Sequence, residues 1–301
     1  MISYTGRNTL IQDLANTSDS TVLTNLHTIM NQYDKTLMAK KPWWFLEREM
    51  TSTSTANQTS LALPATIGKV LGVTLTSGTH KKPMNQVNSR REWDVLTQTS
   101  GVYATYPTHF FVFNDTIQFF PGISTASLTI TVQYLRRQKD IGIADYTTGT
   151  ISAVTNGDGT ITGGSTSWTA KMAGRFIRIT DSYTANTGDG EWYEIASYTS
   201  ATELELQGTY QGISIAAGSA AYIIADVSLY PEAYQMLPLY HGLVHYFTSE
   251  NEQPGRANMY QTLKTELLTQ MEDEQKARTT SVRVNTRQPL TFNPNLYPHQ
   301  T

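Results

Sequence analysis

The sequence predicts an α+β protein with a helical-bundle body, antiparallel β hairpins, an inserted small all-β domain (barrel or sandwich) and an extended C-terminal tail. Three observations support this class. Apolar residues recur at helical spacing near both ends of the chain. Between them the pattern changes to the period of two that is typical of strands. Residues 147–226 are rich in Thr, Gly and Ser with closely spaced turn signals, which favours a compact β module.

The same observations predict four parts of the chain. Residues 1–146 are expected to form a body of helices and hairpins, and residues 147–226 an inserted β module. Residues 227–278 are expected to be helices that complete the body. Residues 279–301 contain three spaced prolines and no apolar period, so we expect an extended tail.

Two helices are predicted near the N-terminus. The first covers residues 8–16, with Asn8 as its candidate cap. A longer helix follows, because Ser18 or Asp19 can cap it and apolar residues then recur on one face. It is expected to end at residues 40–42, where two lysines suit the negative end of the helix dipole and a proline cannot continue the helix.

An aromatic cluster follows this helix directly. Trp43, Trp44 and Phe45 are adjacent in the sequence and Leu46 comes next. Large aromatic side chains usually bury much apolar area, which predicts core anchors where the helix meets a sheet. The alternative is that these residues anchor a subunit interface, whose buried centre favours the same residue types.

Strands dominate the region after this cluster. Five are expected in the body, at residues 60–64, 67–75, 111–113, 116–120 and 128–134. Asn114 and Asp115 form the connection of a tight hairpin, because both residue types tolerate positive φ. Pro121 and Gly122 are expected to end the second strand of that hairpin.

The remaining elements are predicted in the same way. Six strands are expected in the β module, at residues 151–155, 160–162, 176–179, 192–195, 204–206 and 222–224. Pro231 suits the first turn of a helix that residues 253–255 interrupt. A second helix follows through Met271, with a charged end at residues 272–278. The two helices are expected to pack as an antiparallel hairpin.

Composition excludes several classes of function. The chain has no cysteine, which removes disulfides, thiolate metal sites and cysteine nucleophiles. The formal net charge is −3, and basic residues occur in local pairs such as Arg136-Arg137 without forming a run, so no surface that grips nucleic acid is predicted. No apolar stretch has the length of a membrane span and the N-terminus has no signal pattern, so we expect no membrane partner.

Three local motifs are candidates for chemical sites. His241 and His245 are four residues apart on a predicted helix, but Gly242 stands where the metalloprotease motif needs glutamate. Residues 156–159 (Asn-Gly-Asp-Gly) match a hairpin turn better than a calcium loop, because later acidic ligands are missing. The acidic loop 181–191 favours a solvated turn. We therefore expect no catalytic residue, no cofactor and no metal.

The order of these elements resembles the tailed-bacteriophage head–tail adaptor proteins, also called connector or head-completion proteins. The pattern comprises a helix, the aromatic stretch from Trp43, the strand ending in Leu63-Pro64, the hairpin ending at Pro121, and the strand Leu128–Tyr134. The resemblance covers most of the chain before the tail. The β module is similar to small β modules of phage neck and tail proteins.

This resemblance implies a structural virion protein of the neck, assembled in the host cytoplasm. The implied partners are other copies in a ring, expected to be a dodecamer, the portal protein, and a tail, nozzle or tail-terminator protein. Genomic double-stranded DNA would pass through the lumen without sequence-specific binding. Docking to the portal is implied for C-terminal segments, and the predicted docking residues are Arg283, Val284, Arg287, Leu290, Phe292 and Tyr297.

Two other functions are compatible with the β-rich middle of the chain. A receptor-binding or decoration component would use residues 147–226 as the binder, and the isolated module would then bind a ligand. A hydrolase would show a cleft with converging carboxylates of perturbed pKa in the same region. The terminal helices favour the adaptor, because they suit ring packing and serve neither alternative.

Overall fold

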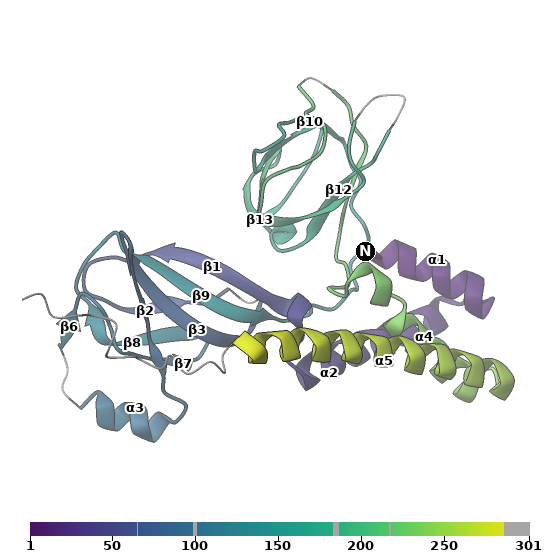
Figure 1. Cartoon of the computed structure of the whole chain (residues 1–301). Coiled ribbons are helices and arrows are strands. Elements are labelled where there is room, and N and C mark those ends of the chain that lie inside the picture. The colour runs from purple at the N-terminus through teal and green to yellow at the C-terminus, as the bar shows by residue number, and fades with distance from the viewer. Residues whose placement is uncertain (65, 99–100, 183–186, 217, 286–301) are drawn as a thin grey trace, which may run out of the picture.

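The chain folds into a helical unit, a β sandwich and the β module, which meet at one junction (Figure 1). The structure, a computed structural model, describes residues 1–285 except 65, 99–100, 183–186 and 217. Its mixture of helices and mainly antiparallel sheets confirms the predicted α+β class. The division into an inserted domain and a completing body stays a proposal.

The helical unit combines both ends of the chain. Its helices are α1 (Tyr4–Ala15), α2 (Ser20–Lys40), α4 (Leu237–Ser249) and α5 (Pro254–Asn285). α1 begins before the predicted Asn8, because the Ser3 hydroxyl accepts a hydrogen bond from the Gly6 N–H and caps the first turn. The predicted cap of α2 is confirmed: Asp19 Oδ1 accepts from the Thr21 N–H at 2.7 Å.

The starts of the two C-terminal helices, α4 and α5, differ in their relation to proline, and aromatic residues pack the two helices together. Pro231 precedes only the short 3₁₀ turn η3 (Glu232–Tyr234), so the expectation that it opens the helix was wrong and α4 starts at Leu237. Pro254 opens α5, where its missing N–H costs nothing. Phe247 of α4 stacks on Tyr260 of α5 with ring centroids 5.7 Å apart, as expected for a helix hairpin.

α5 also corrects the predicted tail. The helix continues to Asn285, so residues 279–285 are helical and not extended. These residues have no apolar period of their own, but adding a turn to an existing helix is much cheaper than nucleating one. The rest of the predicted tail, residues 286–301, lies outside the described residues.

The β sandwich has two sheets. One has the order β1 (Glu47–Thr53), β9 (Thr129–Arg136), β3 (Ile67–Ser77), β4 (His80–Pro83). The other has the order β2 (Gln58–Ala62), β8 (Thr116–Ile123), β7 (His109–Phe113), β5 (Asn85–Gln86), with β6 (Tyr103–Ala104) beside β8. Their facing side chains form one core, which includes Val73, Ile130 and Phe119.

The β7–β8 hairpin confirms one expectation and corrects another. Asn114 and Asp115 connect the strands with φ of 48° and 52°, as the tight turn requires. β8 does not end at Pro121 but changes partner there. The Phe120 carbonyl still accepts from the Thr108 N–H beside β7, whereas the Gly122 N–H donates to the Val102 carbonyl. The missing N–H of proline falls at this change of partner, so no ladder bond is lost.

A short helix, α3 (Arg90–Leu96), lies in the region for which only strands were predicted. Its buried Trp93 stacks on Phe111 of β7, with ring centroids 5.5 Å apart. So short a helix with one buried residue gives almost no periodic signal, so the pattern could not reveal it.

The β module is one antiparallel sheet with its own core. The order is β10 (Thr150–Val154), β11 (Thr160–Gly164), β14 (Glu203–Leu206), β13 (Trp192–Ser200), β12 (Phe176–Ile179), β15 (Tyr222–Ala225). All six expected strands are present. Trp168 and Tyr210 fill the core between the strands. No helix in the described part of the chain is long and apolar enough to cross a membrane.

Candidate interaction site at the junction

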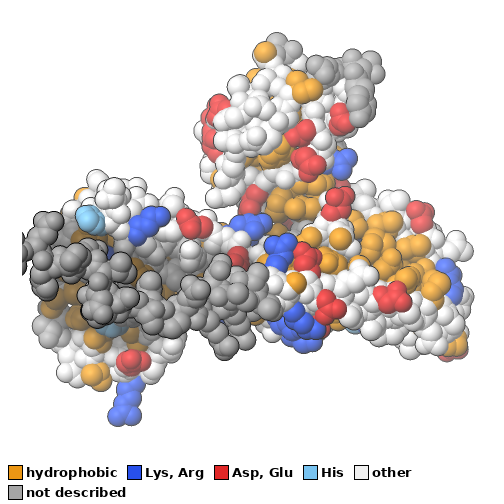
Figure 2. All heavy atoms as spheres, viewed as in Figure 1, with side chains coloured by type: hydrophobic (Ala, Val, Ile, Leu, Met, Phe, Trp, Pro, Cys, Tyr) orange, Lys and Arg blue, Asp and Glu red, His pale blue; other side chains and the backbone are white. Residues whose placement is uncertain are grey.

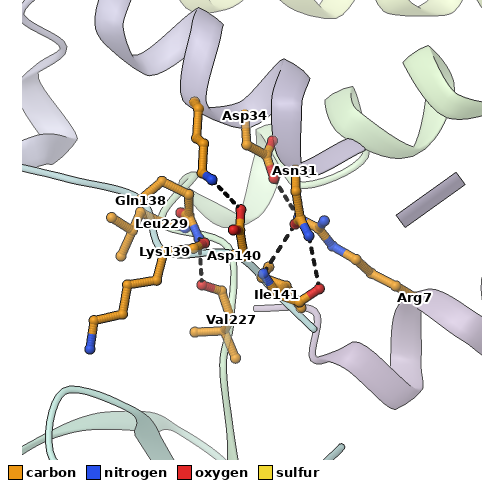
Figure 3. Close-up of polar contacts among 10 residues, drawn as sticks. Arg7, Asn31, Asp34, Gln138, Lys139, Asp140, Ile141, Val227 and Leu229 are labelled. Carbon is orange, nitrogen blue, oxygen red and sulfur yellow. Dashed lines mark hydrogen bonds and ion pairs between the residues drawn. The ribbon is translucent and has the colours of Figure 1, made fainter. Parts of the chain in front are cut away.

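The chain leaving the sandwich is fixed against α2 (Figure 3). Asn31 on α2 forms two hydrogen bonds with the backbone of Ile141: its Nδ2 donates to the carbonyl and its Oδ1 accepts from the N–H, each at 3.1 Å. One turn further, Lys35 Nζ lies 2.6 Å from Asp140 Oδ1. The segment between β9 and the β module therefore follows a defined path along the helix.

The chain returning from the β module is tied to the same segment. The buried Gln138 amide accepts from the Leu229 N–H at 3.0 Å, and its Nε2 donates to the Val227 carbonyl at 3.4 Å. Figure 3 shows Gln138 pointing toward both residues. The Gln138 side chain thus joins the segment that leads to the β module and the segment that comes back from it, beside the helical unit.

Two arginine–carboxylate pairs lie at this junction, one between β9 and the β module and one within the module. Arg136, the last residue of β9, binds both carboxylate oxygens of Glu194 on β13, with Nη1 2.7 Å from Oε2. Arg175 Nε lies 3.2 Å from Asp226 Oδ1. Burial raises the pKa of Glu194 and of Asp226, and the paired arginine opposes each shift. Both carboxylates are bound by arginine, so they do not form the converging catalytic pair that a hydrolase would need.

A cavity of about 840 Å³ opens beside this junction, between the end of α2, the start of β3 and the segment after β9. Its cationic lining residues are Lys35, Lys40, Lys41, Lys69, Arg136, Arg137 and Lys139, and its acidic lining residue is Asp140. Most of the other lining residues are apolar, among them Met38 and Leu46, and Gln138 is polar. We call this the cationic cavity. Figure 2 shows Lys and Arg side chains gathered where the three units meet.

The cationic cavity keeps an excess of positive charge after its ion pairs are counted. Asp140, Glu194 and Glu272 pair with three of its cations, Lys35, Arg136 and Lys41. Within the described residues no carboxylate lies at ion-pair distance from the exposed Lys40, Lys69 or Lys139. In the sequence these cations occur as single residues or local pairs, and the fold brings them together here. The cavity is suited to an anionic group.

The aromatic cluster lies in the chain between Pro42 and Leu46, two residues that line this cavity. Trp43 is fully buried, and its Nε1 donates to the Leu37 carbonyl at 2.8 Å. Trp44 and Phe45 are half-buried, and they meet edge to face with ring centroids 5.2 Å apart. Trp43 lies in the core between the helical unit and the sandwich, together with Leu46 and Leu135.

The charged end of the C-terminal helix packs on this cluster. The Trp44 N–H donates to Gln275 Oε1 at 3.0 Å, Lys41 pairs with Glu272 at 2.6 Å, and the Arg278 guanidinium lies over the Trp44 ring. The sequence predicted that residues 272–278 form a charged helix end, but it did not show what this end contacts. In the structure the charged end joins the C-terminal helix to the segment that follows α2.

The other candidate residues do not come together into a site. His241 stacks on Tyr33 with ring centroids 4.2 Å apart, and burial lowers its pKa to about 4. His245 is exposed and interacts with Ser249. Among the described residues no group of three or more potential ligands is placed to hold a metal ion.

The two loops of the β module also have structural partners. Asn156 Nδ2 donates to the carbonyls of Gln211 and Gly212 at 2.8 and 3.0 Å, which fixes the β10–β11 turn. In the acidic loop, Asp189 accepts hydrogen bonds from the Glu191 N–H and the Tyr193 hydroxyl. Both sets of bonds fit the turn interpretation.

The predicted portal-docking residues lie at or past the end of the described structure. Arg283 and Val284 belong to the last turns of α5. The remaining four lie outside the described residues: Arg287, Leu290, Phe292 and Tyr297. Their docking role stays a prediction.

Comparison with known proteins gives one family. Residues 8–154 match the family model described as SU10 adaptor protein. The matched segment contains α2, the aromatic cluster, the β sandwich and the first strand of the β module. No curated protein matches the chain. The predicted resemblance to a phage adaptor family is therefore confirmed over residues 8–154.

Proposed function

We propose that the protein is a structural component of the virion neck, where copies form a ring that connects the portal to the tail and lets genomic DNA pass. The observation that supports this most is the family match, which begins in α1 and runs through the whole sandwich. A structural adaptor needs no catalytic site, and the junction residues described above pair with one another instead of converging on a substrate.

The helical unit supports the same proposal. α4 and α5 lie outside the matched segment, yet they pack against α1 and α2 and complete their core. α5 has 32 residues, and Met259 and Leu263 on it are exposed apolar side chains one turn apart. Exposed apolar residues on a long helix favour contact with a neighbouring subunit.

Electron microscopy of the purified protein, alone and mixed with the portal protein, tests this function. We expect closed rings, and complexes in which a ring is stacked on the portal. The mass of the rings gives the number of copies, for which a dodecamer is the expectation from the family resemblance. A protein that stays monomeric and never joins the portal would contradict the proposal.

The tail is proposed to dock on the portal, which follows from the family resemblance. Truncation after Asn285 removes Arg287, Leu290, Phe292 and Tyr297 and leaves α5 complete. We expect the truncated protein to form rings but to bind the portal at least about tenfold more weakly, since several of the proposed docking side chains are lost together. A variant with residues 286–301 in scrambled order is the control for length and composition. Undiminished portal binding by the truncated protein would rule out this role.

A further inference from the structure

The helical unit carries opposite charges at its two ends. One end borders the cationic cavity. At the other end lie the α1–α2 turn and the α4–α5 turn, which Arg256 joins by donating from Nη2 to the Leu14 carbonyl at 2.9 Å. Four exposed carboxylates gather on these turns, and we call them the acidic end: Asp13, Asp19, Glu250 and Glu252.

The two ends are too far apart to meet within one chain. Asp19 caps the start of α2 and Lys40 is its last residue. The helix has 21 residues, which at a rise of about 1.5 Å per residue separates the ends by about 30 Å. Glu250 and Glu252 have no ion pair within the described part of the chain. The acidic end therefore cannot reach the cavity of its own chain, whereas that of a second copy can.

We propose that the cationic cavity of one copy receives the acidic end of its neighbour, with Glu250 and Glu252 facing Lys40 and Lys69. The proposal rests on the ring described under the proposed function and deepens it by naming the contact. A contact between two different surfaces of the same protein is head-to-tail, and such contacts close into rings when the rotation between copies allows it. The two surfaces lie at opposite ends of α2, so they belong to different sides of the helical unit.

The lining of the cavity favours a protein occupant over nucleic acid. Met38, Leu46 and Leu135 contribute apolar surface below the cations. Carboxylates held near such a surface are attracted more strongly than in open water, because the local dielectric constant is lower. Duplex DNA instead draws on cations spread along a face to follow its phosphates. Here the cations are concentrated in one cavity.

Charge reversal on each side tests the contact. The cavity variant combines Lys40→Glu with Lys69→Glu, and the acidic-end variant combines Glu250→Lys with Glu252→Lys. In each, like charges would face each other, and we expect the protein concentration needed for half-maximal ring formation to rise roughly a hundredfold. The variant with all four changes restores opposite charges and is expected to return within about tenfold of the wild type. Analytical ultracentrifugation measures these concentrations.

Two controls keep the outcomes separate. The first control combines Lys81→Glu with Lys171→Glu. It makes the same change in net charge as the cavity variant, but at exposed lysines outside the cavity, and it should leave assembly unchanged. Thermal unfolding of each variant checks that it is folded. If wild type forms rings and both reversed variants form them equally well, the contact is overturned while the ring function stands. If wild type forms no ring even with the portal, the proposed function itself falls.

A third result would reassign the cavity. If the cavity variant loses assembly and the fourfold variant does not recover, the neighbour's acidic end is not the occupant. Retention of duplex DNA by wild type, and not by the cavity variant, in a gel-shift measurement would then assign the cavity to nucleic acid and overturn the proposal.

Discussion

Replacing Trp43 by alanine is expected to lower the free energy of unfolding by about 3–5 kcal/mol, the range typical of large aromatic residues in a core. Trp43 is fully buried where the helical unit meets the sandwich, and its Nε1 satisfies the Leu37 carbonyl near the end of α2. The substitution removes both the packing and that hydrogen bond. Chemical denaturation followed by circular dichroism measures the change.

Trp44→Ala is the matched control, because Trp44 is the adjacent residue and is only half-buried. We expect a smaller loss of stability. The contact of Arg278 with the Trp44 ring is lost, whereas the bond to Gln275 is kept because it uses the backbone N–H of residue 44. Equal effects of the two substitutions, or a loss below about 1 kcal/mol for Trp43→Ala, would contradict the core role of Trp43.

The second large effect is expected at the buried pair of Arg7 on α1 and Asp34 on α2. Arg7 Nη2 lies 2.8 Å from Asp34 Oδ2, and their side chains are 3% and 0% exposed. Arg7→Met removes one partner and leaves a carboxylate buried without its counter-ion, which typically costs about 3–5 kcal/mol. Because Arg7→Met combined with Asp34→Leu leaves no buried charge, this double variant is expected to recover most of that loss.

The loss in Arg7→Met should depend on pH. Burial already raises the pKa of Asp34 and Arg7 opposes the shift, so removing Arg7 raises the pKa further. When the pKa is higher in the folded than in the unfolded state, stability is greatest at low pH and is lost as the pH rises from the unfolded value to the folded value. The difference between wild type and Arg7→Met should therefore be larger at about pH 7 than at about pH 4. A difference that does not change with pH would show that lost packing, and not the unpaired charge, is responsible.

The elements with strong local signals were predictable from the sequence. Asp19 at the start of α2 and Asn114-Asp115 between β7 and β8 act through their own backbone neighbours, so a short window contains the cause. The strands of the β module were found for the same reason, since turn residues separate them closely. Helix α3 and the continuation of β8 past Pro121 depend on distant partners, Phe111 and Val102, which a local pattern does not contain.

The cationic cavity shows why the candidate site was missed. Its cations come from the end of α2, from Lys69 on β3 and from the segment 136–139. In the sequence each of these groups is too small to stand out as a basic run. These cations come together only in the folded chain, where β9 pairs with β3 close to the end of α2. A search for a contiguous basic run cannot detect such a site.

The two chain segments that meet at the junction, residues 137–146 and 224–229, have a consequence for how this architecture can vary. The chain leaves toward the β module and returns from it side by side, joined by Gln138 to Val227 and Leu229 and by the Tyr146 N–H to the Ile224 carbonyl. The two ends of any segment inserted here therefore lie close together, whatever the length of that segment. The entropic cost of bringing the ends of a loop together rises only slowly with the length of the loop. If the module is an insertion, as proposed, it could be exchanged, enlarged or deleted at this point while the rest of the chain keeps its packing.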